Sequence, residues 1–180
     1  MGVCSAAKPT LLAGYIITIV AFVIHLIGFA TPYWNSIENT VKILTISVTT
    51  KTYFGLWRYC TSQSSASRSI SKCGSTGDIP TLDGELTGTQ AVECISFILF
   101  VAAVICLTIR IFALKDKDIL ILVALGLCIA AGVFALIGVV IFGINEQFKD
   151  NLGFSLAFCV IGGIAGFIAG GVLAVDKYKS

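Results

Sequence analysis

The sequence predicts an all-α membrane protein, a left-handed bundle of four helices with a small antiparallel β-sheet outside the membrane. Of the 180 residues, 57% are hydrophobic and 12% are charged, whereas soluble domains carry about 25% charged residues. Four apolar stretches are each long enough to cross a bilayer core of about 30 Å, which needs roughly 20 helical residues. We therefore predict one four-span membrane domain over residues 1–180.

The four predicted spans cover residues 11–30, 91–114, 119–143 and 152–175. The last two contain no charged residue. Ionisable groups inside a membrane can mark transport sites, but Glu93 and Arg110 lie near span ends, where long side chains reach the interface. We interpret the single His25 as a neutral packing residue that is hydrogen-bonded or contacts the sheet.

Basic residues predict which side of the membrane holds the termini. On the side that holds both termini, six basic residues flank the spans: Lys8, Arg110, Lys115, Lys117, Lys177 and Lys179. On the other side only Lys42 and Lys149 lie within about 15 residues of a span, and Lys and Arg collect in cytoplasmic segments. The predicted cytosolic segments are therefore 1–10, 115–118 and 176–180, and the predicted extracellular loops are 31–90 and 144–151.

The long loop is predicted to contain the sheet. Residues 41–49 are rich in β-branched side chains and residues 51–60 contain four aromatic ones, so each stretch predicts a strand. The serine-rich residues 61–71 predict a turn, and residues 78–88, with Pro and Gly, predict irregular chain. A sheet this small is not stable alone, so we expect it to rest on the helix ends.

The cysteines agree with this placement. Of the seven, Cys60 and Cys73 lie in the loop assigned to the outside, where an even pair predicts a disulfide. Closing that short loop contributes about 3 kcal/mol in the chain-entropy model, and two free thiols are the alternative. Cys4, near the first span, is a candidate for palmitoylation or an unmodified thiol.

Six residues of this loop stand in a recognisable order: Trp34, Gly55, Leu56, Trp57, Cys60 and Cys73. This order resembles the claudin signature, within the superfamily of peripheral myelin proteins, epithelial membrane proteins, claudins and calcium-channel gamma subunits. The resemblance extends to the four spans, the long first outer loop and the short second one. It implies a claudin-like fold.

The motif residues have a physical interpretation. Gly55 allows a close backbone approach or a conformation that other residues avoid. Leu56 and Trp57 would be anchors between the sheet and the helix ends, and Trp34 lies just past the first span, where interfacial tryptophans collect. Fold stabilisation without any partner contact is the alternative for all of them.

The resemblance implies a cell–cell junction protein that self-associates within one membrane and between cells, with related claudins as further partners. It would form a paracellular barrier or an ion-selective pore. The candidate selectivity charges are Glu38, Lys42, Asp78, Asp83 and Glu85. Solvated charges without such a role are the alternative for each. The other functional hypothesis is an auxiliary tetraspan subunit that regulates a channel or receptor.

Several departures indicate a divergent member. Twelve residues separate Cys60 from Cys73, more than in most claudins. Asn35 follows the first tryptophan, where claudins commonly carry a basic residue, and Gln90 occupies the entry to the second span, where they carry an arginine. A terminal Ser180 fits a PDZ pocket poorly, so scaffold binding is not expected.

The fourth span carries Gly162, Gly166 and Gly170 on one face. Such spacing lets helices approach closely, either between copies or inside one bundle, and we favour the second. No nucleophile–base pair, phosphate loop or metal cluster is visible, so we predict no enzyme activity, catalytic residue, metal or cofactor. A net charge of +2 gives no reason to expect nucleic acid, and membrane lipid is the expected partner.

Overall fold

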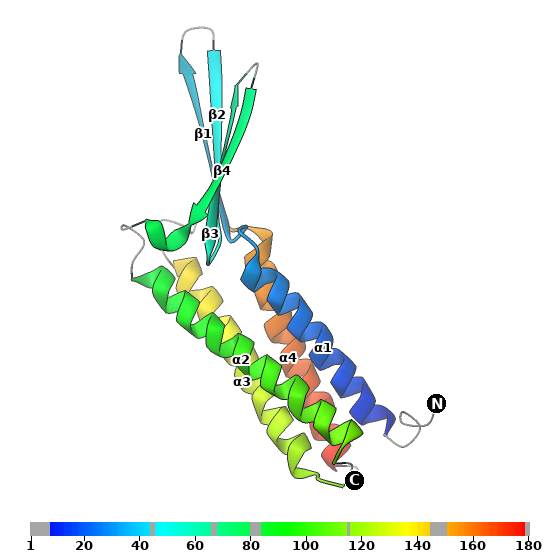
Figure 1. The fold of residues 1–180 in the computed structure, drawn as a ribbon. Coiled ribbons are helices and arrows are strands. Elements are labelled where there is room, and N and C mark those ends of the chain that lie inside the picture. Colours follow the sequence, from blue (N-terminus) through cyan, green and yellow to red (C-terminus); the bar gives the residue numbers. More distant parts are fainter. Residues whose placement is uncertain are drawn as a thin grey trace.

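The computed structural model describes residues 8–43, 46–65, 68–79, 84–114, 116–144 and 151–178. Its four helices are α1 (Pro9–Ala30), α2 (Glu85–Phe112), α3 (Ile119–Ile144) and α4 (Phe154–Tyr178). All four are long and apolar enough to cross a membrane. They form one bundle in which α1 packs on α4 and α2 packs on α3, with the sheet standing on one end (Figure 1).

Helix α2 begins at Glu85, well before the predicted residue 91. The first turns contain polar residues, so hydropathy alone does not find them. As a result Glu93 lies two turns inside the helix and its side chain is fully buried. The expectation that Glu93 snorkels to the interface is therefore wrong.

The four strands of the sheet are β1 (Asn35–Ile43), β2 (Ile46–Phe54), β3 (Arg58–Ser65) and β4 (Arg68–Ser75). They pair antiparallel in the order β1-β2-β3-β4, so each strand pairs with its neighbour in sequence. A short 3-10 helix, η2 (Thr76–Asp78), follows and leads the chain back to the bundle.

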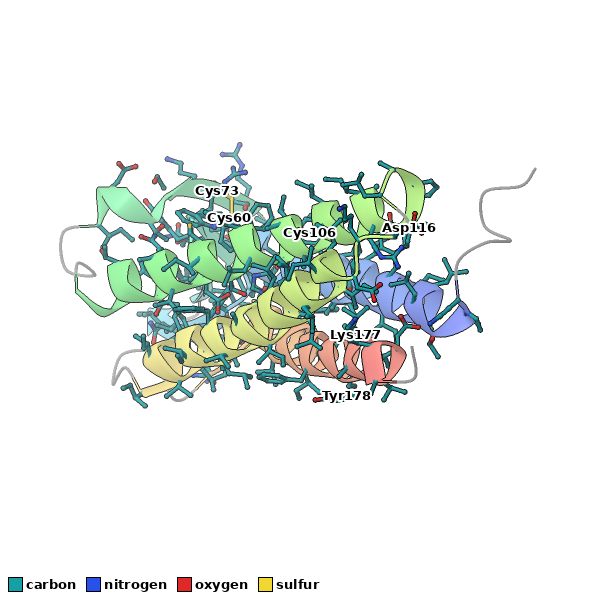
Figure 2. The ribbon with its side chains drawn as sticks, turned by 90° about the horizontal axis from the view of Figure 1, so that it is seen from below. Cys60, Cys73, Cys106, Asp116, Lys177 and Tyr178 are labelled. Carbon is teal, nitrogen blue, oxygen red and sulfur yellow. A yellow bond between two sulfur atoms is a disulfide. The ribbon has the colours of Figure 1, made fainter. Side chains whose placement is uncertain are left out.

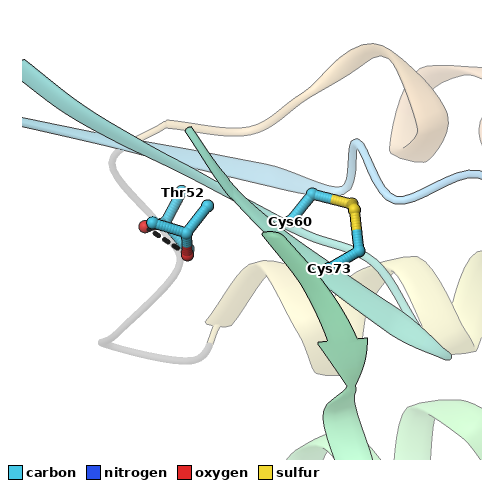
Figure 3. Close-up of a disulfide and its surroundings, with 4 residues drawn as sticks. Thr52, Cys60 and Cys73 are labelled. Carbon is cyan, nitrogen blue, oxygen red and sulfur yellow. Dashed lines mark hydrogen bonds between the residues drawn. A yellow bond between two sulfur atoms is a disulfide. The ribbon is translucent and has the colours of Figure 1, made fainter. Parts of the chain in front are cut away.

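Strand positions differ from the sequence prediction. Residues 41–49 contain the end of β1 and the start of β2, and residues 51–60 contain the break at Gly55 between β2 and β3. Of the serine-rich residues 61–71, predicted as a turn, 61–65 lie in β3 and 68–71 lie in β4. Neighbouring strands explain this outcome, because cross-strand pairs such as the Thr52 and Thr61 hydroxyls, 3.2 Å apart (Figure 3), stabilise strands that propensity disfavours.

The three glycines of α4 that the sequence placed on one face lie against other helices of the same bundle. A Cβ on Gly162 would be 3.0 Å from the backbone nitrogen of His25 in α1. One on Gly166 would be 3.1 Å from the carbonyl oxygen of Cys128 in α3, and one on Gly170 would be 3.0 Å from Ile129. These glycines therefore allow α4 to approach α1 and α3 closely inside one molecule.

Replacing Gly162 with alanine should destabilise the bundle by about 1–3 kcal/mol, because the added methyl overlaps the α1 backbone. Gly171 is the matched control on the same helix, since a Cβ there would meet nothing described within 4 Å. We expect Gly171→Ala to be neutral or slightly stabilising. Unfolding in detergent micelles measures both, and equal effects would contradict the packing described here.

Charged side chains join the helices at the end of the bundle away from the sheet. Figure 2 shows Lys177 near this end and Cys60 and Cys73 near the other. Asp118, between α2 and α3, accepts hydrogen bonds from Arg110 at 3.1 Å and from Lys177 at 2.8 Å. These hydrogen bonds hold the pKa of the Asp118 carboxyl below its ordinary value, and the bond from Lys177 has the larger effect.

The stabilisation from Asp118 should be complete above the ordinary aspartate pKa of about 3.9 and should disappear as pH falls through the lowered folded-state pKa. We therefore expect Asp118→Asn to flatten the loss of thermal stability below about pH 4. Asp116→Asn, a change at an exposed aspartate two residues away, is the control. Identical acid profiles for the wild type and Asp118→Asn would show that these bonds do not stabilise the bundle.

Candidate interaction surface

Trp34 connects the sheet to three helices. Its side chain is fully buried, its Nε1 donates to the carbonyl of Gly28 at 2.8 Å, and its ring meets Phe142 of α3 edge-on at 5.0 Å. Its backbone N–H donates to Phe54 in β2 and its carbonyl accepts from Gly153, just before α4. Trp34 is thus a buried anchor, although sequence position alone suggested an interfacial residue.

Gly55 permits the close crossing of two backbone segments. It lies between β2 and β3, where its N–H donates to the carbonyl of Arg58 at 2.9 Å. A Cβ at this position would be 2.5 Å from the Cα of Pro32 and 2.8 Å from the carbonyl of Thr31. Any side chain here would push the sheet away from the end of α1.

Leu56 holds the sheet to α2. Its side chain is fully buried, and its carbonyl accepts from the Thr76 hydroxyl at 2.8 Å and the Gln90 amide at 2.6 Å. Gln90 is one of the departures noted in the sequence, and here its amide provides the link between loop and helix. The sequence identified the position, but it gave no indication of this bond or of the role of Thr76.

Trp57 is less enclosed than its neighbours. It meets Phe29 of α1 edge-on at 5.2 Å, yet 36% of the residue is exposed. Its indole therefore covers the boundary between sheet and bundle instead of filling a core. Of the two anchors expected from Leu56 and Trp57, Leu56 is the buried one.

Cys60 and Cys73 form a disulfide between directly opposed residues of β3 and β4 (Figure 3). The bridge fixes the register of the second hairpin, which would otherwise depend on serine and threonine pairs. A slip by one residue would exchange the two faces of the sheet. The disulfide therefore determines which side chains each face presents.

The candidate selectivity charges do not form one cluster. Glu38 pairs across strands with Lys51 at 2.9 Å, and the hydrogen bond and charge of Glu38 raise the pKa of the Lys51 ammonium. Lys42 lies exposed near the end of β1, whereas Asp78 lies exposed in η2 beside the bundle. Glu85 opens α2, while Asp83 and Cys4 lie outside the described residues.

The strand register gives the sheet two different faces. Side chains alternate along a strand and paired residues share a face. One face, which we call the apolar face, carries Ile37, Val41, Val48 and Ile70, with Phe54 and Tyr59 at the base of the sheet and the basic residues Arg68 and Lys72. A hollow of about 250 Å³ on it is lined by Thr61, Gln63, Ile70 and Lys72. The opposite face carries the disulfide and the Glu38–Lys51 pair.

Two residues of the apolar face are strongly exposed, Val41 at 56% and Ile70 at 51%. In the described part of the chain β4 has no strand on its outer side, and β1 has only the bridge from Asn35 to Leu152 at its base. Open strand edges present backbone groups that can pair with another strand. The upper part of the sheet therefore has the features of an interaction surface.

These features define a four-span membrane protein whose first loop is a disulfide-linked sheet anchored in the helix ends by a tryptophan. A family model described as PMP-22/EMP/MP20/Claudin tight junction matches residues 19–175, and no curated protein matches the chain. The chain belongs to this PMP-22/EMP/MP20/Claudin family, as the loop motif predicted. Members of the family are not enzymes, in agreement with the sequence prediction.

Replacing Trp34 with phenylalanine should destabilise the protein by about 1–3 kcal/mol, since it opens a cavity and leaves the Gly28 carbonyl without its donor. Trp57→Phe is the matched control, because phenylalanine keeps an aromatic contact with Phe29 at a partly exposed site, and we expect a change below about 1 kcal/mol. Denaturant unfolding of the oxidised protein measures both. A larger loss for Trp57→Phe would contradict the assignment of Trp34 as the anchor.

Proposed function

We propose that this protein is a claudin-like cell–cell junction protein that self-associates to control the paracellular space. The observation that carries the proposal is the sheet itself, which projects away from the bundle (Figure 1). Its register gives it the apolar face, and among the described residues no further strand pairs with β4 or with the upper part of β1. Strands β1 and β2 have nine residues each, about 30 Å at 3.4 Å per residue. Strands that only covered the ends of four helices could be much shorter.

The proposal places the sheet outside the cell and both termini in the cytosol. The Cys60–Cys73 disulfide supports this orientation, because such bonds form in the secretory and extracellular compartments. The basic residues at the opposite end of the bundle, including Arg110 and Lys177, support it independently. A rigid projection of this kind then faces the gap between neighbouring cells.

The proposed occupant of the sheet surface is a second copy of the chain. An edge strand can pair with the edge of another sheet, and main-chain bonds then supply affinity while side chains supply specificity. Val41 and Ile70 would be covered in such a contact. Related family members with a similar sheet are further candidate partners, and lateral contacts between bundles in one membrane would extend the assembly.

Charge selectivity would arise from the side chains that line the space between such sheets. Among the described candidates Lys42, Asp78 and Glu38 are exposed, and Glu38 is paired with Lys51. Asp83 and Glu85 remain candidates from the sequence. Because acidic and basic groups occur together, either a barrier or a pore is compatible with this surface.

We expect Ile70→Glu to abolish the junctional strands that the self-associated protein would form between non-adherent cells expressing it. The variant replaces an exposed apolar side chain that the contact would cover with a carboxylate that would have to lose its water there. Ser69→Glu is the matched control, since Ser69 is the exposed neighbour on the opposite face of the same strand. Freeze-fracture microscopy detects the junctional strands, and surface biotinylation confirms delivery of each variant to the plasma membrane. Transepithelial resistance and dilution potentials then measure barrier and selectivity.

Wild-type protein that stays diffuse at cell contacts and co-purifies with a channel would contradict the junction proposal and favour an auxiliary subunit. Equal loss of junctional strands in Ile70→Glu and Ser69→Glu would show that the apolar face does not form the contact between copies.

A further inference from the structure

Three potential metal ligands from three different helices meet inside the bundle. They are His25 of α1, Glu93 of α2 and Cys159 of α4, and each is fully buried. Their ligand atoms all lie within 4.8 Å of one another. The Nε2 atom of His25 is 3.6 Å from Oε2 of Glu93.

The polar atoms of this cluster lack partners. Neither ring nitrogen of His25 and neither carboxylate oxygen of Glu93 has a hydrogen bond within the described part of the chain. Their surroundings are apolar, with the Phe100 ring centred 5.3 Å from that of His25. Buried polar groups without partners are costly, and a charged one costs far more. A bound ligand would remove this cost.

We propose that His25, Glu93 and Cys159 bind a Zn²⁺ ion that links α1, α2 and α4. Imidazole nitrogen, carboxylate oxygen and cysteine sulfur are the ligands that zinc takes in proteins. At tetrahedral angles, zinc–ligand bonds of about 2.0–2.3 Å place ligand atoms roughly 3.3–3.6 Å apart. The 3.6 Å between His25 and Glu93 lies at the upper end of this range, and the ligand atoms, all within 4.8 Å of one another, would draw together on binding.

Charge balance also supports a divalent ion. A neutral imidazole, a carboxylate and a thiolate together carry two negative charges, which Zn²⁺ neutralises. Binding displaces two protons, that of the Cys159 thiol and the one that His25 and Glu93 share without a metal, and both pass to water. The net neutral complex avoids leaving an uncompensated charge in the membrane interior. A water molecule can complete the four-coordinate shell.

Glycines on neighbouring helices hold the three ligands in place. A Cβ on Gly28 would be 2.6 Å from Sγ of Cys159, and a Cβ on Gly162 would be 2.9 Å from Cβ of His25. One on Gly138 of α3 would overlap the carboxylate of Glu93. The missing side chains at these three glycines thus give the ligand residues the space that they occupy.

The cluster lies just beneath the sheet. His25 is five residues from the end of α1 and Cys159 five residues from the start of α4, so both lie about 7.5 Å below the helix ends. Trp34 is bonded to Gly28 in the same layer. Zinc at this place would fix the spacing of the three helices on which the sheet rests.

The test uses the full chain purified in detergent micelles and measures zinc by mass spectrometry. We expect about one zinc per chain, and at least a tenfold reduction in Cys159→Ser and Glu93→Gln. Cys128→Ser is the matched control, because Cys128 is another buried free cysteine outside the cluster. It should keep its zinc. Substituted Co²⁺ should give a thiolate charge-transfer band in the wild type and the control, and none in Cys159→Ser.

A second measurement uses the wild type alone, so its result does not depend on whether the variants fold. Bound zinc should slow alkylation of Cys159 relative to the same protein stripped by a chelator, with Cys128 unaffected. Three results on folded wild-type protein would together overturn the proposal. They are a lack of stoichiometric zinc, a lack of the cobalt band after metal addition, and alkylation of Cys159 at a rate that does not depend on zinc. The pair of His25 and Glu93 would then share a proton without a metal.

Discussion

The junction between sheet and bundle depends on the burial of Trp34. A small sheet cannot be stable by itself. Trp34 contributes apolar contact and three hydrogen bonds, to Gly28 in α1, to Phe54 in β2 and to Gly153 just before α4. Gly55 and Leu56 complete the attachment on the side of α1 and α2. The attachment at the base sets the direction in which the sheet projects, while the strand register and the disulfide set which side chains each face presents.

The sequence predicted the membrane helices well, because a lipid environment demands long apolar segments and the chain contains four of them. It misplaced the start of α2, where polar residues such as Gln90 are helical because they bond to the loop. Hydropathy measures the preference for lipid, and these turns are stabilised by contacts with protein. The buried position of Glu93 is a direct consequence of that longer helix.

The sheet was predicted less accurately than the helices. Its existence, location and cysteine pair were evident, but its hairpins were not, since residues 61–71 consist largely of serine and other turn-favouring residues. Strand formation there depends on neighbours that a local pattern does not contain. The meeting of His25, Glu93 and Cys159 was invisible for a similar reason. The three residues are far apart in sequence, on different helices, and only the packed bundle brings them together.

The attachment of the sheet also affects how the protein can be made. The loop that forms the sheet is synthesised directly after α1, but the pocket for Trp34 includes Phe142 near the end of α3 and Gly153 just before α4. The hairpins and their disulfide can form early, whereas docking must wait until most of the chain has been translated and inserted. Until then the apolar residues at the base of the sheet stay unprotected, so biogenesis passes through a stage at which quality-control factors can recognise an unfinished molecule.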